Sequence, residues 1–403
     1  MKKENIAIII TKLNGGGAER CASNLSIELS KKYNVILVVF NTSNMTYPHG
    51  GELIDLGIIE SDGMLNKVLN VFKRAKKLRE IKKKYKIDCA ISLLDGPNLV
   101  NVLSSCGEKT IVSVRNMLSH EPMGRLRRFL VKYAGTHSDM TVSLSEMVKL
   151  DLINNFEIPE SKITTIYNHC DPQLLRELCE KNPLSFEVKT DKVNFVTMGR
   201  LNNQKGQWHL IRSFKKVLEA IPNAHLYILG VGELEEPLKR LISDLGMTDN
   251  VTMPGYIKNP HGIYEYCEAF VFPSLFEGLG NVLLEALAFD MPIISCDCEA
   301  GPREILAPNT DLKNKAKSVE VAEYGVLTPV CDGKHFNAED PLTYEEGCLA
   351  DAMIYLHNNP DVREEYRTKA KQRMMRFDKL LNDRNYAFVF LLLYVCYRFF
   401  GRG

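Results

Sequence analysis

Two glutamates and two glycines interrupt an otherwise apolar stretch, SLFEGLGNVLLEAL, at residues 274–287. Gly278 and Gly280 lie between Glu277 and Glu285. Glycines before a helix let the backbone approach a phosphate at the helix N-terminus, where the helix dipole favours negative charge. Glu277 in the loop can accept hydrogen bonds from sugar hydroxyls, and Glu285, about one turn into the helix, can hold both hydroxyls of a ribose. The pattern predicts a site for a nucleotide or sugar phosphate.

A second group of residues supplies positive charge. In GRLNNQKGQWHLIRSF, Arg200 and Lys205 follow a predicted strand, residues 193–199, and precede a predicted helix. Two cations on such a loop can bind a diphosphate from one side. Open α/β sheets bind ligands at the carboxyl ends of their strands, which is where this loop begins.

A glycine loop near the start, NGGGAER, offers unhindered backbone N–H groups at a predicted helix start, and these can also point at an anion. A nicotinamide enzyme would need G-x-G-x-x-G. The last position of that pattern holds Arg20 in this loop and Glu235 in the later GVGELE segment. The sequence therefore carries neither a dinucleotide fingerprint nor a Walker phosphate loop.

Alternating strands and helices must position these residues. The first set of predicted strands covers residues 5–11, 34–40, 88–94, 109–114 and 139–145, and the second covers 193–199, 225–230, 250–255, 268–274 and 291–297. We predict that the strand 268–274 ends at Ser274 and that Asn281 is the N-cap of the following helix. Strands joined by helices in this way are typical of parallel sheets covered on both faces.

The fold class that follows is α/β, with two doubly wound, Rossmann-like domains that place a ligand cleft between the carboxyl ends of their strands. The polar, proline-bearing segment CEKNPLSFEVKTD suits a linker near residue 184. We therefore predict a first domain at 1–184, a second at 185–372 and a C-terminal segment at 373–403.

Composition is that of a soluble globular chain, with 403 residues, 45% apolar and 25% charged. Eleven cysteines form no C-x-x-C pair and no secretory leader is recognisable, which favours the cytosol over a disulfide framework. Cys296 and Cys298 form a C-x-C without partner ligands nearby, so we interpret them as buried residues and predict no metal site.

Charge is unevenly distributed along the chain. Residues 1–184 hold 26 Lys and Arg against 20 Asp and Glu, whereas the remainder holds 25 against 30. Much of the excess lies in KRAKKLREIKKKYK, residues 73–86, and in GRLRRFLVKY, residues 124–133. Apolar residues recur at helical spacing from just before the first of these regions to its end, at Leu65, Leu69, Phe72, Ala75, Leu78, Ile81 and Tyr85. Each cluster is compatible with a solvated helix face, but together they favour an anionic membrane surface over nucleic acid, since no stacking aromatics accompany them.

Four motifs together resemble retaining glycosyltransferases of the GT-B fold, family 4. They are GGGAER, GRLNNQKG, the E-x₇-E of EGLGNVLLE, and AGPREIL at residues 300–306. The last is similar to branches that build bacterial surface polysaccharides and lipid-linked oligosaccharides. The resemblance covers residues 6 to about 370 and implies a nucleotide-sugar donor, in this family most often a UDP-sugar, and a glycan acceptor that is expected to be lipid-linked.

The resemblance also implies roles for individual residues. Arg200 and Lys205 would bind the donor diphosphate, Glu277 would contact the transferred sugar and Glu285 the ribose. Backbone groups near the phosphates would come from Gly16, Gly17, Gly278, Gly280, Asn281 and Val282, and the base would lie near Tyr256 in PGYI.

One position departs from the family pattern. Many members have a histidine after the fourth or fifth strand of the first domain that contacts the reacting sugar. Here SVRNMLSHEP offers Arg115, Asn116 and, slightly later, His120. His120 is one candidate for this role, and Arg115 or Asn116 is the alternative.

The resemblance implies an electrostatic mechanism without a metal ion. Departure of the leaving group places charge on a diphosphate at which Arg200, Lys205 and helix-end amides are aimed. Retention is usually explained in the family by attack on the same face, with the leaving phosphate taking the acceptor proton. No nucleophile of the protein is assigned.

The C-terminal segment is unusually apolar, since NYAFVFLLLYVCYRFF has an apolar core at residues 386–397. A helix of that length spans about 18 Å, well short of a hydrocarbon core of about 30 Å. It is either a core helix that crosses back onto the first domain or an interfacial anchor. With the basic clusters, it favours a cytoplasmic protein bound peripherally at the inner face of the cell membrane.

Two rival functions remain open at this stage. A sugar-nucleotide epimerase can share the two-domain architecture, although an acid–base set would be expected in place of the E-x₇-E loop. A non-catalytic sugar-nucleotide-binding partner would bind the donor without turnover.

Overall fold

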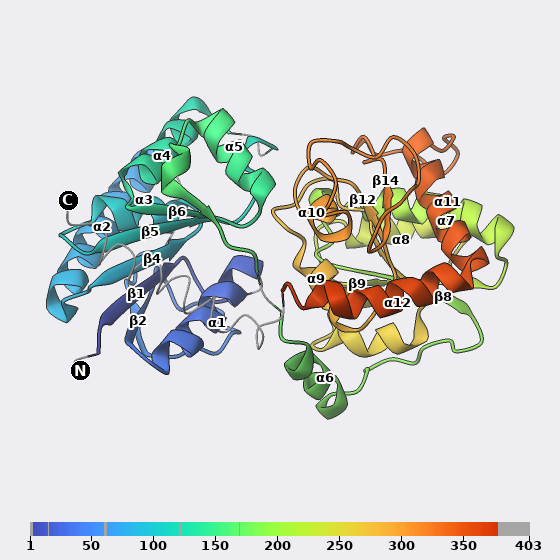
Figure 1. Cartoon of the computed structure of the whole chain (residues 1–403), viewed down its shortest axis with the longest axis horizontal. Coiled ribbons are helices and arrows are strands. Elements are labelled where there is room, and N and C mark those ends of the chain that lie inside the picture. The colour runs from blue at the N-terminus through green and yellow to red at the C-terminus, as the bar shows by residue number, and fades with distance from the viewer. Residues whose placement is uncertain (1–2, 15, 60–62, 121–122, 169, 378–403) are drawn as a thin grey trace. The chain divides into compact units, whose positions relative to one another are not determined.

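The computed structural model describes residues 3–14, 16–59, 63–120, 123–168 and 170–377 (Figure 1). They divide between residues 168 and 169 into two compact units, here called unit 1 and unit 2. Each unit contains one seven-stranded sheet. The predicted α/β class with two Rossmann-like sheets is confirmed. The predicted C-terminal segment, apart from its first residues, lies outside the described residues, as does the apolar core at 386–397.

Unit 1 has a fully parallel sheet in the order β3-β2-β1-β4-β5-β6-β7. Its strands are β1 (Asn5–Ile10), β2 (Asn34–Val39), β3 (Glu52–Asp55), β4 (Cys89–Leu93), β5 (Lys109–Val114), β6 (Met140–Ser143) and β7 (Ile163–Thr165). Its helices are α1 (Gly17–Ser30), α2 (Met64–Tyr85), α3 (Asp95–Leu103), α4 (Arg125–His137) and α5 (Glu146–Phe156), with 3₁₀ turns η1 (Leu118–His120) and η2 (Glu160–Lys162). Almost every residue of β1, β2 and β4 is buried, as expected of parallel strands covered on both faces.

Unit 2 repeats the design with the strand order β10-β9-β8-β11-β12-β14-β13, in which only the β13–β14 pair of the described strands is antiparallel. Its strands are β8 (Val193–Met198), β9 (Ala224–Leu229), β10 (Val251–Gly255), β11 (Ala269–Phe272), β12 (Ile293–Cys296), β13 (Glu320–Val321) and β14 (Val326–Thr328). Its helices are α6 (Pro172–Lys181), α7 (Gln207–Ala220), α8 (Glu235–Asp244), α9 (Asn281–Ala288), α10 (Pro302–Leu306), α11 (Tyr344–Asn358) and α12 (Pro360–Met374), with 3₁₀ segments η3 (Asn203–Lys205) and η4 (Pro260–Tyr266).

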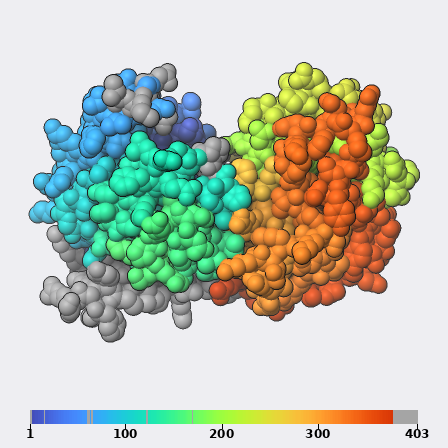
Figure 2. Space-filling view, turned by 90° about the horizontal axis from the view of Figure 1, so that it is seen from above, coloured from blue at the N-terminus to red at the C-terminus, as the bar shows by residue number. Residues whose placement is uncertain are grey.

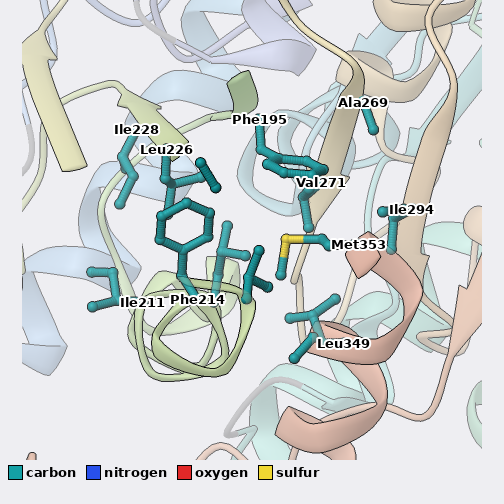
Figure 3. Close-up of a cluster of buried hydrophobic side chains, with 14 of the residues drawn as sticks. Phe195, Ile211, Phe214, Leu226, Ile228, Ala269, Val271, Ile294, Leu349 and Met353 are labelled. Atoms are coloured by element: carbon teal, nitrogen blue, oxygen red, sulfur yellow. The ribbon is translucent and has the colours of Figure 1, made fainter. Parts of the chain in front are cut away.

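An apolar cluster of unit 2 fixes α7 against the sheet. Ile211 and Phe214 of α7 meet Phe195 of β8, and α11 contributes Leu349 and Met353 (Figure 3). The Phe195 and Phe214 rings meet edge to face, 6.3 Å between centres. Truncation of such buried side chains to alanine typically costs about 2–5 kcal/mol. The helix that follows the predicted phosphate-binding loop is therefore held rigidly on β8.

Strand order reverses between β1 and β4 in unit 1 and, among the parallel strands of unit 2, between β8 and β11. Loops that leave two adjacent strands in opposite directions open a crevice at this switch point, and open α/β sheets bind ligands there. In unit 2 those two loops carry Arg200 and Lys205 after β8 and Glu277 after β11. The topology therefore brings the predicted site residues of unit 2 to one edge.

All ten predicted strands are present, whereas β3, β7, β13 and β14 were not predicted. Of these, β3, β7 and β13 are at most four residues long and only partly buried, so they lack a clear apolar pattern. The boundary between the units falls before the predicted linker near residue 184, because α6 packs against η4 and α9 of unit 2.

The predicted basic amphipathic helix exists as α2, but the prediction of its faces was partly wrong. Leu69 and Phe72 are exposed, although the spacing placed them on the apolar face. Lys82 is fully buried, with its Nζ 2.5 Å from Glu108 Oε1. A helix of 22 residues spans about 33 Å, which exceeds the roughly 20 Å of the strands it covers, so its first turns extend past the sheet.

Candidate active site

Lys205 and Glu277 face each other at the switch point of unit 2. Lys205 ends η3, after β8, and Glu277 lies in the loop after β11. The Lys205 Nζ donates a hydrogen bond to Glu277 Oε1 at 2.5 Å, and the two side chains are only 18% and 8% exposed. Lys205 Nζ also lies 5.2 Å from the centre of the Phe272 ring. The pair thus sets a cation beside an anionic acceptor, as recognition of a phosphate and an adjoining hydroxyl requires.

Backbone contacts join the two loops that carry this pair. Leu275 N donates to Gln204 O and Gln204 Nε2 donates to Phe276 O, each at 2.9 Å. Gly206 has φ of +59°, and a Cβ on it would lie 2.5 Å from Pro273 O, so only glycine permits this close approach. The loops therefore form one rigid support for Lys205 and Glu277.

Arg200 and Tyr256 are exposed near the same edge of the sheet. Gln207 Nε2 donates to Arg200 O at 3.0 Å, which fixes the backbone, while the Arg200 side chain is exposed. Within the described residues its guanidinium makes no ion pair. Tyr256 follows β10 and is 71% exposed, consistent with a ring available for stacking.

The start of α9 differs from the prediction in one residue. The N-cap is Gly280, at φ +85°, and Asn281 is the first helical residue, so the prediction of Asn281 as the N-cap was wrong. The left-handed conformation favours glycine, and a Cβ there would lie 3.2 Å from the Phe272 ring and from the Leu283 side chain. The first N–H groups of a helix have no partner within it, so those of Asn281 and Val282 can bind an anion.

The loop before α9 is shaped by the AGPREIL segment. A Cβ on Gly301, which has φ of +98°, would lie 2.0 Å from Leu279 O. The buried Arg303 donates to Asp297 Oδ2 at 2.6 Å and to Glu320 Oε2 at 2.7 Å. This motif therefore supports the loop that contains Gly278 and Gly280.

Glu285 has a partner that sequence reasoning missed. Glu285 is the fifth residue of α9, and His261 Nε2 of η4 donates to its Oε2 at 3.0 Å. Burial alone would lower the pKa of His261, but hydrogen bonds to Cys179 and Glu285 and the charge of Glu285 raise it to about 9. His261 is therefore an imidazolium at neutral pH. A lone histidine in PHGIYEY gives no spacing signal that could have revealed this pair.

Comparison with known proteins agrees with this geometry. A model of the family Glycosyl transferases group 1 matches residues 180–321, and one of Glycosyltransferase Family 4 matches residues 15–174. The chain is 34% identical to an uncharacterized glycosyltransferase of Methanocaldococcus jannaschii, over 76% of this chain and 80% of the relative. The chain belongs to the group 1 glycosyltransferases.

Another relative comes from Campylobacter jejuni. It is named N-acetylgalactosamine-N,N'-diacetylbacillosaminyl-diphospho-undecaprenol 4-alpha-N-acetylgalactosaminyltransferase and is 27% identical over 94% of this chain and 96% of its own length. Among solved structures, a glycosyltransferase of Rickettsia africae superposes with a TM-score of 0.71 at 16% identity, covering 98% of this chain and 99% of its own. The Anabaena protein HepE in complex with UDP and glucose gives 0.74 at 15% identity, covering 96% and 99%. These structural neighbours show the GT-B fold.

In unit 1 of this glycosyltransferase, the predicted glycines lie at the start of α1. Gly16 is the N-cap, with φ of −120°, and Gly17 is the first helical residue; Gly15 lies outside the described residues. A Cβ on Gly16 would lie 2.0 Å from Glu19 Oε2. The Glu19 carboxylate, the end of a flexible side chain in the first turn of α1, thus lies beside this helix start.

The residues that follow β5 leave the three candidates for the family histidine open. Arg115 Nη2 donates to Asn168 Oδ1, and Arg115 and Asn116 are half-buried. His120 is exposed, in η1. The roles of all the predicted site residues stay predictions.

The described residues of the glycosyltransferase also bear on metal binding and on membrane insertion. No group of three or more His, Cys, Asp or Glu side chains there is arranged to hold a metal ion. No helix there combines the length and apolarity that a membrane crossing needs. Cys296 and Cys298 are buried, as predicted.

Proposed function

We propose that this glycosyltransferase transfers a hexose or N-acetylhexosamine from a UDP-sugar to a lipid-linked glycan with retention of anomeric configuration. The observation that carries the proposal is the Lys205–Glu277 contact at the switch point of unit 2. One cation for a diphosphate and one carboxylate for a sugar hydroxyl lie side by side on joined loops. Glu285 follows on α9, where a ribose would be bound.

Leaving-group stabilisation is the main contribution of the protein in this proposal. The bond between the anomeric carbon and the phosphate oxygen breaks, and its electron pair passes to that oxygen. Lys205, Arg200 and the N–H groups at the start of α9 meet the developing charge. An acceptor hydroxyl oxygen bonds to the anomeric carbon on the same face, and its proton passes to the leaving phosphate oxygen. Because these cations already face the diphosphate, we propose that no metal ion is needed.

Two observations support UDP as the nucleotide. HepE is described in complex with UDP and glucose, and the exposed Tyr256 offers a ring on which a base can stack. The identity of the nucleotide is the first quantity to measure.

A lipid-linked acceptor is supported by the names of two Campylobacter relatives, both of which refer to undecaprenol-linked diphosphates. It is also supported by α4, whose Leu126 and Phe129 are exposed beside Arg125 and Arg128. The surface over α4 and α5, teal to green, faces the viewer in Figure 2. Exposed apolar and basic side chains on one helix are typical of proteins that bind an anionic membrane surface. We propose that the protein works at the cytoplasmic face of the cell membrane.

The test begins with thermal shift of the full chain in the presence of UDP, GDP, ADP and dTDP. Binding stabilises the folded state by about 2.7 kcal/mol at a ligand concentration of 100 Kd. We expect UDP to give the largest shift and Lys205→Ala to lose most of it. A larger shift with another nucleotide would overturn the choice of UDP, and no shift with any would overturn the donor site.

Transfer is then measured with radiolabelled UDP-sugars and membrane lipid extracts, and the anomeric configuration of the product is read by NMR. An inverted product would overturn retention. Epimerised UDP-sugar in the absence of acceptor would favour an epimerase, and donor binding without turnover on any extract would favour a non-catalytic partner.

A further inference from the structure

We propose that His261 is a positioning residue that holds the Glu285 carboxylate ionised and oriented for the two hydroxyls of a ribose. The proposal rests on the role of Glu285 in the proposed function and extends it to a residue to which neither the sequence motifs nor the relatives assign a role. It also predicts that the donor nucleotide is a ribonucleotide.

The first observation is the contact itself. His261 Nε2 lies 3.0 Å from Glu285 Oε2, and the side chains are 5% and 14% exposed. A hydrogen bond between an imidazolium and a carboxylate is charge-assisted, and these are about twice as strong as neutral ones. A carboxylate has about four lone-pair sites, so one bond from His261 uses only part of its acceptor capacity. His261 can therefore orient Glu285 without preventing it from binding hydroxyls.

The second observation is the fixation of the His261 ring. It stacks on Phe289, with ring planes 9° apart and centres 5.5 Å apart, just past the end of α9. Helix α6 packs against η4, the segment that carries His261, and so restrains it from a second element. Arg176 of α6 also lies over the Phe289 ring, 5.0 Å from its centre. A ring held from α6 and by Phe289 cannot turn away from Glu285 without disrupting both packings.

The third observation is location. Glu285 lies on the helix whose N-terminus points toward the predicted diphosphate, so a ligand bound there by its phosphates would carry its ribose along α9. A second histidine–carboxylate pair offers a contrast. His357 Nδ1 lies 3.0 Å from Glu268 Oε2, but Glu268 directly precedes β11 and so lies at the amino edge of the sheet, away from ligand-binding loops. The same chemistry thus occurs once at the carboxyl edge and once at the opposite edge.

The experiment measures how strongly the protein distinguishes UDP from 2′,3′-dideoxy-UDP, by titration calorimetry on the full chain. In the wild-type protein we expect UDP to bind at least about tenfold more tightly, since hydrogen bonds to charged groups contribute this much. Glu285→Gln should lose most of this ratio. His261→Leu should lower the ratio at least about threefold, whereas His261→Gln, which keeps an N–H donor, should lie between it and the wild type.

Two further measurements separate positioning from general damage. His357→Gln is the matched control and should keep the wild-type ratio. In steady-state transfer, His261→Leu should raise the donor KM more than it lowers kcat, because ribose contacts are made equally in the ground and transition states. Circular dichroism and thermal unfolding establish that each variant is folded.

Each outcome decides between the inference and the function on which it rests. A wild-type ratio of about tenfold that persists in folded His261→Leu overturns the positioning role and leaves the proposed donor site intact. If neither His261 variant folds, the positioning role is overturned in favour of a structural role for His261. If UDP does not bind, the ratio is measured with GDP and ADP and their dideoxy forms, so that a wrong base is not mistaken for a wrong residue. Equal binding of both forms, or no binding of any nucleotide, overturns the ribose role of Glu285 and the inference with it.

Discussion

The carboxyl edge of the sheet in unit 2 and the surface of α4 in unit 1 both carry many charged residues, but they hold them differently. In unit 2 two charged pairs are largely buried, Lys205 with Glu277 and His261 with Glu285, although Arg200 near them is exposed. On α4, Arg127 pairs with Asp95 at 2.7 Å, yet both side chains stay partly exposed. Arg125 and Leu126 are simply exposed.

The two regions differ in how strongly each charge can interact with a ligand or a partner. A charged group fixed in a water-poor crevice acts strongly and needs no reorganisation when a ligand arrives. An exposed charge is screened by salt within about 8–10 Å, and an exposed ion pair contributes only about 0–1 kcal/mol. The site of unit 2 therefore suits recognition of one ligand in one geometry. The surface of α4 suits binding to a broad surface that does not require one fixed geometry. Substitutions at the site of unit 2 should therefore have large and specific effects on activity. Substitutions on α4 should have smaller, additive effects on binding to a surface.

The largest effect is expected at the Lys205–Glu277 pair. Lys205→Ala and Glu277→Ala should each lower transfer by at least about 10²-fold, the cost of losing one preorganised charge in a transition state. The measurement is kcat/KM for sugar transfer, together with the melting temperature of each variant.

Lys216→Ala is the matched control for this prediction. Lys216 lies on α7 and pairs with Asp351 at 2.6 Å, but its side chain is 38% exposed. Its loss should change stability by no more than about 0.5 kcal/mol and leave transfer unchanged. Near-normal turnover in a folded Lys205→Ala or Glu277→Ala variant would refute the assignment of the site.

A smaller effect is expected on α4. Phe129 is 60% exposed, and burying such a ring in a membrane interface contributes up to about 1.5–3 kcal/mol, so Phe129→Ser should weaken binding to anionic vesicles about tenfold. Arg125→Gln should weaken it about fivefold, and only at low salt, since a base near such a surface contributes about 1 kcal/mol. Cosedimentation with phosphatidylglycerol vesicles at two salt concentrations measures both.

Tyr344→Ser provides the comparison, because Tyr344 is 62% exposed but lies on α11 of unit 2. It should bind vesicles as the wild type does. Absence of binding at low salt in the wild type would remove the membrane proposal. Salt-resistant binding that disappears on deletion of residues 385–403 would transfer the role from α4 to the C-terminal segment.

The comparison also explains which parts of the site could be predicted from the sequence. Strand periodicity and the glycines located Lys205 and Glu277 in two separate loops, because both are local patterns. Their contact was not predictable, since it depends on β8 and β11 being neighbours although β9 and β10 lie between them in the chain. The partner of Glu285 was missed for the same reason. His261 stands alone in a 3₁₀ segment, and only tertiary packing brings it to α9.

Two other limits arise from conformation and from helix length. Asn281 is a good N-cap residue by type, but the chain uses Gly280 because the turn requires positive φ, which residue preferences express only weakly. Helical spacing marked Leu69 and Phe72 of α2 as core residues, yet α2 is longer than the sheet beneath it. Helical periodicity indicates which residues share a face of the helix. It does not indicate how far the sheet that covers this face extends.

A third effect concerns the dependence of stability on pH in unit 2. The pKa of His261 is raised to about 9, from an ordinary value of 6.5, so its protonated form is stabilised in the folded state. This contribution is fully present below about pH 6.5 and is lost as the pH rises through about 9. The difference in melting temperature between wild type and His261→Leu should therefore be largest near pH 6 and shrink toward pH 9.5. The titratable and charged groups around the ring are Glu285 of α9, Cys179 and Arg176 of α6, and Tyr264 of η4.

His225 of β9 should behave in the opposite way, which makes it an internal control. Burial, followed by the charges of Lys189 and Lys192, lowers the pKa of His225 to about 4. Its neutral form is favoured by folding, so that contribution is present above about pH 6.5 and is lost as the pH falls toward 4.

A difference in melting temperature between wild type and His261→Leu that does not change between pH 6 and 9.5 would contradict the charged pair with Glu285.

The smallest effect is expected from removal of divalent metal ions. If Lys205, Arg200 and the N–H groups of α9 supply the positive charge that meets the leaving diphosphate, EDTA should leave the rate of transfer unchanged. The assay should use a water-soluble acceptor, because divalent ions also screen anionic lipids and would alter binding through α4 independently of the chemistry. Full loss of activity with EDTA and recovery with Mn²⁺ would show that a metal ion neutralises the diphosphate. Lys205 would then assist that ion instead of replacing it, and the loss in Lys205→Ala should fall well below 10²-fold when Mn²⁺ is saturating.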